Sequence, residues 1–180
     1  MTSLNVPSSG PQKSEHALAF YDSLEPIGVK FMLGSWRGEG FETGHVMDGL
    51  LEAYHWHGKR FESMENVHPL VITTLTGKKT QLNPQYMSPF LGLMIRYKLP
   101  QSAIVGKLFQ LFLPLLSTSR SKARLRMTEF RGVSTATMSY DQLPINDVFR
   151  KVDENTVLGV MDLKGMAQPF LFVLRREQNI

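Results

Sequence analysis

Short runs of apolar and β-branched residues, separated by turn residues, make up most of the chain after residue 26. The runs are about five to eight residues long and are divided by glycine, proline or Asn/Asp pairs, which is the pattern of β-strands joined by tight turns. We predict nine strands, near residues 31–41, 52–61, 70–76, 79–82, 122–130, 133–140, 147–151, 156–162 and 170–175. Residues 76–78 and 153–155 have the composition of hairpin turns.

Two other segments have the spacing of helices. Apolar side chains recur at helical intervals over residues 14–24, where Ser14 is a suitable N-cap and Pro26 ends the segment. Residues 103–116 are apolar on nearly every side but include a lysine, a glutamine and a proline. A helix that spans a bilayer needs about 18–20 consecutive apolar residues. We therefore predict a buried or interfacial helix here, within a helical insertion that interrupts the strands.

The predicted elements indicate a mainly β protein. Eight or nine short strands with tight turns fit a closed antiparallel barrel or a sandwich. We favour the barrel, because it hides every strand edge and can hold a ligand inside. The expected organisation is a flexible tail over residues 1–13 and one domain over residues 14–180. Within that domain, the two halves 24–84 and 120–178 flank the insertion at 85–119, which we expect near one mouth of the barrel.

Composition narrows the class of protein. The chain has 180 residues, of which 42% are hydrophobic, and this excludes wholesale disorder. It contains no cysteine, which excludes disulfides, thiolate metal sites and thiol nucleophiles. The first 13 residues are small and polar, so they do not form the apolar centre of a secretory signal. We expect a cytoplasmic protein, with possible peripheral contact at the inner face of the membrane.

The positive charge is concentrated in one part of the chain. The net charge is +4, but the segment from Arg96 to Arg131 holds eight basic residues and one acidic residue, a net +7. The rest of the chain holds 12 basic and 15 acidic residues, a net −3. Four of the cations, Arg120, Lys122, Arg124 and Arg126, alternate along one predicted strand and so share a face. They directly follow the most apolar segment of the chain.

The most distinctive motif is Gly34-Ser35-Trp36-Arg37-Gly38-Glu39-Gly40. On a strand, Trp36 points to the same face as the glycines, which leave space beside the indole and allow a sharp bend. This arrangement suits the first strand of a small barrel, with Trp36 closing its floor. A purely structural role for Trp36 is the main alternative to ligand contact.

Several sequence motifs, taken in their order along the chain, resemble the bacterial GXWXG family. In the first half they are Phe31-Met-Leu-Gly-Ser-Trp-Arg-Gly-Glu-Gly, Thr43-Gly-His-Val-Met-Asp-Gly-Leu-Leu-Glu, Trp56-His-Gly-Lys-Arg-Phe-Glu and His68-Pro69-Leu70. In the second half, Ala123-Arg-Leu-Arg-Met-Thr-Glu-Phe-Arg-Gly, Ala136-Thr-Met-Ser-Tyr-Asp, Leu143-Pro-Ile-Asn-Asp-Val-Phe-Arg-Lys-Val-Asp, Thr156-Val-Leu-Gly-Val-Met-Asp and Phe172-Val-Leu-Arg-Arg resemble the uncharacterised domain that usually follows it. The resemblance implies a lipocalin-type barrel, distantly similar to the nitrobindins, and lipid binding has been suggested for relatives.

Haem and metal sites are weaker hypotheses. Nitrobindins hold haem through a histidine on a late strand, whereas no histidine follows residue 68 in this chain. Haem is therefore kept as an alternative only, and we expect no resident cofactor. His55 and His57 share a face of the predicted strand, and together with His45 or His68 they could bind zinc. A half-exposed polar face is the simpler interpretation.

Catalytic motifs are missing from the sequence. There is no Gly-x-Ser-x-Gly elbow, phosphate loop or dinucleotide-binding glycine pattern. Acidic residues recur near the ends of strands in the second half, and Asp141 and Asp147 are interpreted as caps of turns. An enzyme that uses the barrel cavity for a small molecule remains an alternative.

We therefore predict a non-catalytic protein that binds a lipid or another amphipathic, anionic, phospholipid-like molecule in the barrel. The candidate pocket residues are Trp36, Trp56, Phe61, Met127, Met138 and Phe172. The candidate contacts for an anionic headgroup are Arg120, Lys122, Arg124 and Arg126. An anionic membrane surface is a second possible partner for these cations. Nucleic acid is not expected, because single-strand binding needs exposed aromatic side chains among the cations.

Overall fold

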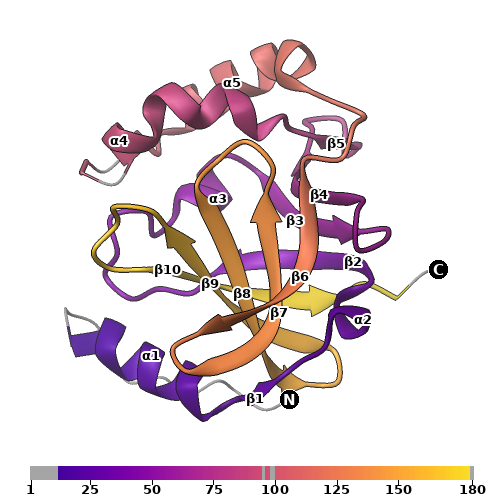
Figure 1. Ribbon diagram of the computed structural model, residues 1–180. Helices are drawn as coiled ribbons and strands as arrows, with labels where there is room; N and C mark the ends of the chain where they lie inside the picture. Colours follow the sequence, from indigo (N-terminus) through magenta and orange to yellow (C-terminus); the bar gives the residue numbers. More distant parts are fainter. Residues whose placement is uncertain (1–11, 95, 98–99, 179–180) are drawn as a thin grey trace.

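The computed structural model describes residues 12–94, 96–97 and 100–178, and its main feature is one antiparallel sheet of ten strands (Figure 1). The strands are β1 Glu25–Pro26, β2 Gly34–Gly40, β3 Trp56–Phe61, β4 Val67–Thr73, β5 Lys79–Gln81, β6 Ala123–Phe130, β7 Val133–Tyr140, β8 Ile145–Asp153, β9 Thr156–Leu163 and β10 Phe170–Arg176. The helices are α1 Gln12–Ser23, α2 Val29–Met32, α3 Leu50–Ala53, the 3-10 helix η1 Pro84–Phe90, α4 Leu91–Met94 and α5 Ala103–Leu116.

Eight of the strands close into a ring. Their order is β8-β7-β6-β4-β3-β2-β10-β9, and β9 also pairs with β8, which completes the circle. The junction between β4 and β6 is the narrowest one, because Val67 and Ala123 form its single paired position. β1 and β5 add to the edges of β8 and β4 outside the circle. The prediction of a mainly β protein is confirmed.

All nine predicted strands overlap an observed strand, but two of them begin three or four residues later than predicted. Residues 29–32 form α2 before β2, and residues 50–53 form α3 before β3. In the second case Gly49 takes a left-handed conformation with φ of 79° and starts a turn of Leu, Glu and Ala, which are good helix formers. The helix predicted from residue 14 begins at Gln12, and the helix predicted over residues 103–116 is α5. Of the predicted flexible tail, residues 1–11 lie outside the described residues.

Different helices cover the two ends and the outside of the ring. α2 lies at the start of β2, whereas α3 is attached to the other end of β2, where the Gly40 N–H donates to Glu52 Oε1 over 2.8 Å. α5 lies across the α3 end (Figure 1). α1 packs Ala17 and Tyr21 against outward side chains of β9 and β10. None of the described helices has both the length and the apolar character required to span a bilayer.

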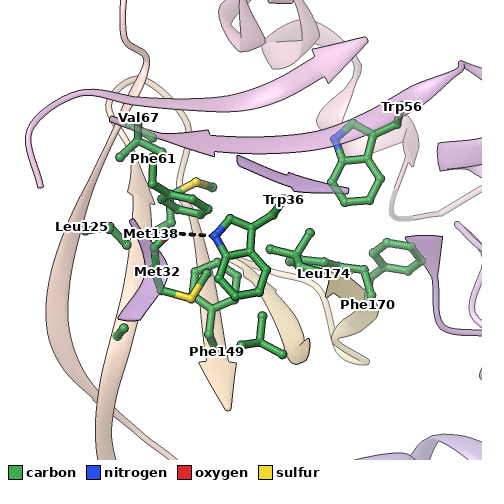
Figure 2. Packing of buried hydrophobic residues seen from close by; sticks show 14 of the residues in the cluster. Met32, Trp36, Trp56, Phe61, Val67, Leu125, Met138, Phe149, Phe170 and Leu174 are labelled. Atoms are coloured by element: carbon green, nitrogen blue, oxygen red, sulfur yellow. Dashed lines mark hydrogen bonds between the residues drawn. The ribbon is translucent and has the colours of Figure 1, made fainter. Parts of the chain in front are cut away.

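The main hydrophobic core fills the inside of the ring (Figure 2). Trp36 is fully buried there, and its Nε1 donates to the Met32 carbonyl of α2 over 2.7 Å. The Arg176 guanidinium stacks 4.3 Å from the Trp36 ring and donates to the Phe31 and Leu33 carbonyls. The α2 end of the ring is therefore closed by packed side chains, as the glycine–tryptophan motif predicted for Trp36.

Candidate functional site

Two adjoining cavities lie at the end of the ring that α3 and α5 cover. The inner cavity, of about 80 Å³, is bounded by residues of β3, β7, β8, β9 and β10 together with α3. The outer cavity, of about 390 Å³, lies between β3, β4 and the inward face of α5. The two share Leu50, Leu51, Trp56, Leu70 and Met87 in their walls. Together they form a mostly apolar space that runs from under α5 into the ring.

A buried ion pair is the main polar feature of the inner cavity. Lys59 Nζ lies 2.7 Å from Asp147 Oδ2, and the two side chains are only 3% and 2% exposed. Lys59 comes from β3 and Asp147 from β8, which are four strands apart in either direction around the ring. The pair therefore crosses the interior from opposite walls. Removing two ions from water is costly, and their mutual attraction offsets that cost only where the geometry of the pair is good and further hydrogen bonds are made.

Aromatic side chains surround the ammonium group. Lys59 Nζ lies 5.0 Å from the ring centre of Phe172, 5.4 Å from that of Trp56 and 5.7 Å from that of Tyr140. These are cation–π distances. Lys59 Nζ also donates to the Pro69 carbonyl over 3.2 Å. The cation thus has partners on several sides.

Burial changes the proton affinity of the acids in this cavity. It raises the pKa of Asp147, against the opposing charge and hydrogen bond of Lys59. It also raises the pKa of Tyr140 well above its ordinary value, with a further contribution from the charge of Asp147. Each shift has the sign expected for an acid in a dry environment.

A bulge in β3 turns Lys59 toward the interior. The pairing of β3 with β4 shifts register between Trp56 and Gly58 and again between Gly58 and Arg60. Gly58 has φ of 147° there, and a Cβ on it would lie 1.9 Å from the Trp36 carbonyl oxygen. Only glycine fits this position. Because of the irregularity, Trp56 and Lys59 are both buried although they lie three positions apart, an odd spacing that would place them on opposite faces of a regular strand.

Of the six predicted pocket residues, Trp56 and Phe172 line the inner cavity. Trp36, Phe61 and Met138 lie in the core of the ring, and Phe61 and Met138 appear beside Trp36 in Figure 2. Met127 is 47% exposed.

The four predicted headgroup contacts lie on the outer side of β6 or just before it. Arg124 pairs with Asp141 and Arg126 with Glu65, at 3.4 Å and 2.7 Å, and Lys122 reaches Gln142 Oε1 over 3.5 Å. Arg120 is exposed shortly after the end of α5. The structure therefore separates these cations from Trp56 and Phe172.

The four candidate metal-binding histidines make separate contacts. Nδ1 of His45 accepts from the Met47 N–H, and its Nε2 donates to the Gln168 carbonyl. His57 contacts Glu177, while His68 lies 3.6 Å from Glu62. His55 has φ of 56° and is exposed. Within the described ranges, no three His, Cys, Asp or Glu side chains gather as metal ligands.

Sequence reasoning missed the two charged residues of the site. The prediction that Asp147 caps a turn is wrong, because Asp147 lies inside β8 with its side chain in the interior. The available signal was the strand pattern itself, because Asp147 lies between buried Ile145 and Phe149. Lys59 carried no comparable signal, since the bulge at Gly58 disrupts the alternation.

Comparison with known proteins identifies both halves of the chain. Residues 19–77 match the model of the GXWXG protein family, and residues 121–176 match that of a domain of unknown function, DUF4334. A crystal structure of a protein from Thermomonospora curvata is 31% identical, with a TM-score of 0.65, and the match covers 95% of this chain and 89% of that one. The chain belongs to the GXWXG family. No curated protein sequence matches it.

The family signature has a structural explanation in this chain. Gly34 has φ of 117°, a conformation that L side chains rarely adopt. Trp36 fills the α2 end of the core. A Cβ on Gly38 would lie 2.0 Å from Trp56 Cζ3, so this glycine makes room for the ring that lines both cavities. The signature Gly-x-Trp-x-Gly therefore connects the closed end of the ring to the end that holds the cavities.

Proposed function

We propose that this protein is a non-catalytic binding protein for a lipid or another amphipathic small molecule, held inside a lipocalin-like barrel. The observation that carries the proposal is the pair of adjoining cavities, which are apolar for most of their length and contain the Lys59–Asp147 pair at the inner end. An apolar tail fits the outer cavity, and a polar end fits the inner one. The closed ring of eight strands supports the barrel description.

The dimensions and lining of the cavities support a small ligand. The outer cavity, of about 390 Å³, is within the range of about 300–1,000 Å³ that small-molecule sites occupy. Its walls include Ile72, Leu82, Phe109 and Leu116. Burial of an apolar chain against such side chains contributes about 25 cal/mol for each Å² removed from water, and the few polar groups fix its orientation.

Native mass spectrometry of the purified protein, followed by lipid extraction, tests the proposal directly. Titration with a fluorescent naphthalene sulfonate and its displacement by medium-chain amphiphiles gives affinities. Leu116→Trp fills the outer cavity and should weaken binding at least about tenfold. Leu111→Trp, on the outward face of the same helix and 71% exposed, is the matched control and should bind as the wild type does. If no amphiphile copurifies or binds, the proposal is wrong.

A second candidate function is reversible contact with an anionic membrane, and the outward face of α5 favours it. Ile104, Leu108, Leu111, Phe112 and Leu115 recur on one side of this helix and are 51–75% exposed. The opposite side contributes Phe109 and Leu116 to the outer cavity. Exposed apolar patches of this kind are typical of sites that contact a partner or a membrane.

Charge favours a lipid surface as the occupant of this face. No Asp or Glu occurs between Glu65 and Glu129, whereas Lys107 lies on α5 and Arg120 follows it. Near an anionic bilayer, each such cation contributes about 1 kcal/mol. The predicted role of Arg120 and Lys122 as headgroup contacts is retained in this setting, with the headgroups belonging to the bilayer.

Cosedimentation with vesicles tests this function. Vesicles of phosphatidylcholine and phosphatidylglycerol should retain the protein, and vesicles of phosphatidylcholine alone should retain it less. Leu111→Ser should reduce retention about tenfold, because one buried leucine is lost, while Met127→Ser on β6 should not. Failure of the anionic vesicles to retain the protein contradicts the proposal. A dimer that light scattering detects in the wild type and not in Leu111→Ser also contradicts the proposal, because a second copy of the chain then covers the outward face of α5.

A further inference from the structure

Two buried polar atoms in the wall of the inner cavity have no hydrogen-bond partner among the residues that the structure describes. They are Asp147 Oδ1 and Trp56 Nε1, and both side chains line the same cavity. Asp147 Oδ2 is satisfied by Lys59, so one carboxylate oxygen is paired and the other is free. Asp147 Oδ1 and Trp56 Nε1 therefore offer the cavity a free acceptor and a free donor, in a wall whose other residues are apolar apart from Lys59 and Tyr140. Buried polar groups normally have partners, which indicates that something else supplies them here.

The charge of the inner cavity is already balanced. Lys59 and Asp147 carry opposite charges 2.7 Å apart, and the other residues in its wall are uncharged. An anionic ligand would compete with Asp147 for the ammonium group, and a cationic ligand would compete with Lys59 for the carboxylate. Either would leave one charge buried without compensation, which is strongly unfavourable. A neutral polar group meets neither penalty.

We propose that the ligand of this cavity carries an uncharged hydroxyl group at its inner end, which donates a hydrogen bond to Asp147 Oδ1. The proposal rests on the amphiphile-binding function put forward above. A hydroxyl both donates and accepts, so it suits a wall that offers a free carboxylate oxygen and the free N–H of Trp56. The apolar remainder of the molecule extends past Leu50, Leu70 and Met87 into the outer cavity.

This inference selects among lipid classes. Long-chain alcohols and other hydroxyl-bearing apolar molecules fit it, and ionised fatty acids do not. A ligand that has an ether oxygen in place of the hydroxyl accepts but cannot donate, so it leaves Asp147 Oδ1 without a partner. The difference between the alcohol and its methyl ether therefore tests the proposed hydrogen bond, because the two have the same apolar chain and differ only in the methyl group that replaces the hydroxyl hydrogen.

Displacement titrations with three ligands of equal chain length test the inference: dodecanol, dodecyl methyl ether and dodecanoate. The wild type should bind the alcohol about tenfold or more tightly than the ether, and dodecanoate most weakly. Asp147→Asn can direct an N–H₂ donor to the position of Oδ1 while its carbonyl faces Lys59. This variant should lose the preference for the alcohol. Asp162→Asn, at an exposed position of β9, is the matched control and should keep it.

The outcomes separate this inference from the proposed function. Equal binding of the alcohol and the ether by the wild type overturns the hydroxyl assignment and leaves amphiphile binding intact. Tighter binding of dodecanoate also overturns it, in favour of an anionic inner end. Binding of none of the three, with no other amphiphile copurifying, contradicts the function itself. The comparison within the wild type stands even if Asp147→Asn fails to fold.

Discussion

At the scale of single residues, the interior ion pair gives the sharpest prediction about stability. Lys59→Met leaves the Asp147 carboxylate buried without its cation, and removal of one partner of a buried pair costs about 3–5 kcal/mol. The double variant Lys59→Met, Asp147→Leu removes both charges and should be more stable than the single variant. Urea unfolding, followed by far-UV circular dichroism, measures both values.

The difference in the free energy of unfolding between the single and double variants tests whether the cost arises from the unpaired Asp147 carboxylate. Arg60→Met, next to Lys59 but on the outer side and paired with Glu62 where both side chains are half exposed, is the control and should change the free energy of unfolding by about 1 kcal/mol or less. If the double variant is less stable than Lys59→Met alone, the cost does not arise from an uncompensated carboxylate.

A buried histidine makes stability depend on pH. Burial lowers the pKa of His45 below its ordinary value of 6.5, against the opposing influence of the Gln168 carbonyl. Its Nδ1 already accepts from the Met47 N–H over 3.1 Å, so protonation breaks that bond. The folded state binds the proton less readily than the unfolded state does. The contribution of His45 is therefore present above about pH 6.5 and is lost as the pH falls through the lowered pKa.

Urea unfolding at about pH 7.5 and about pH 5 measures this effect. The wild type should lose stability at the lower pH, and His45→Asn should lose less, because its side chain does not titrate. Some dependence should remain, since burial also lowers the pKa of His68. An unchanged pH dependence in His45→Asn would show that this ring does not couple protonation to unfolding.

At the scale of the element, Gly38 of β2 leaves the space that the Trp56 ring of β3 occupies. A Cβ at Gly38 would lie 2.0 Å from Trp56 Cζ3, so Gly38→Ala forces the indole out of place. The expected cost is about 1–3 kcal/mol, together with weaker binding of amphiphiles, because Trp56 lines both cavities. Gly92→Ala, which has nothing within 4 Å of its new Cβ, should change stability by about 0.5 kcal/mol or less. Thermal unfolding and the near-UV spectrum of the tryptophans measure the difference.

The elements predicted well are those defined by local signals. The turn at Gly77 has φ of 80° and joins β4 to β5, and the apolar run over residues 103–116 is α5 to the residue. Strand alternation and turn composition are properties of neighbouring residues, so they can be recognised in a single sequence.

The Lys59–Asp147 pair depends on two structural features that the alternation of polar and apolar residues along the strands does not reveal. Lys59 and Asp147 lie 88 positions apart, on opposite strands of the ring. The bulge at Gly58 must also form before Lys59 faces inward. Trp56 and Phe172 could be predicted as pocket residues because large aromatic side chains on strands usually face the core.

At the scale of the whole molecule, α5 covers the outer cavity but is attached differently at its two ends. After its last residue, backbone hydrogen bonds link the chain to β5: Thr118 N donates to the Gln81 carbonyl, and Leu82 bridges Ser117. Before its first residue, the attachments include Gln101 Nε2 to the Asp48 carbonyl, over 2.7 Å, and the Tyr54 hydroxyl to the Pro100 carbonyl, over 3.2 Å. Side-chain bonds of this kind break more easily than a paired backbone, so we expect ligands to pass where the N-terminal end of α5 lifts.

Gln101→Ala tests this route. Loss of the hydrogen bond should raise the population of the lifted state, and with it both the association and dissociation rates of a fluorescent amphiphile, by about threefold to tenfold. The dissociation constant should change little, because the bond contributes to the cover and not to the contacts with the ligand. Gln85→Ala, whose side chain is exposed in η1, is the control for stopped-flow measurements. If both rates match those of the wild type while binding persists, the ligand reaches the ring by another path, and the narrow junction between β4 and β6 is then the next place to test.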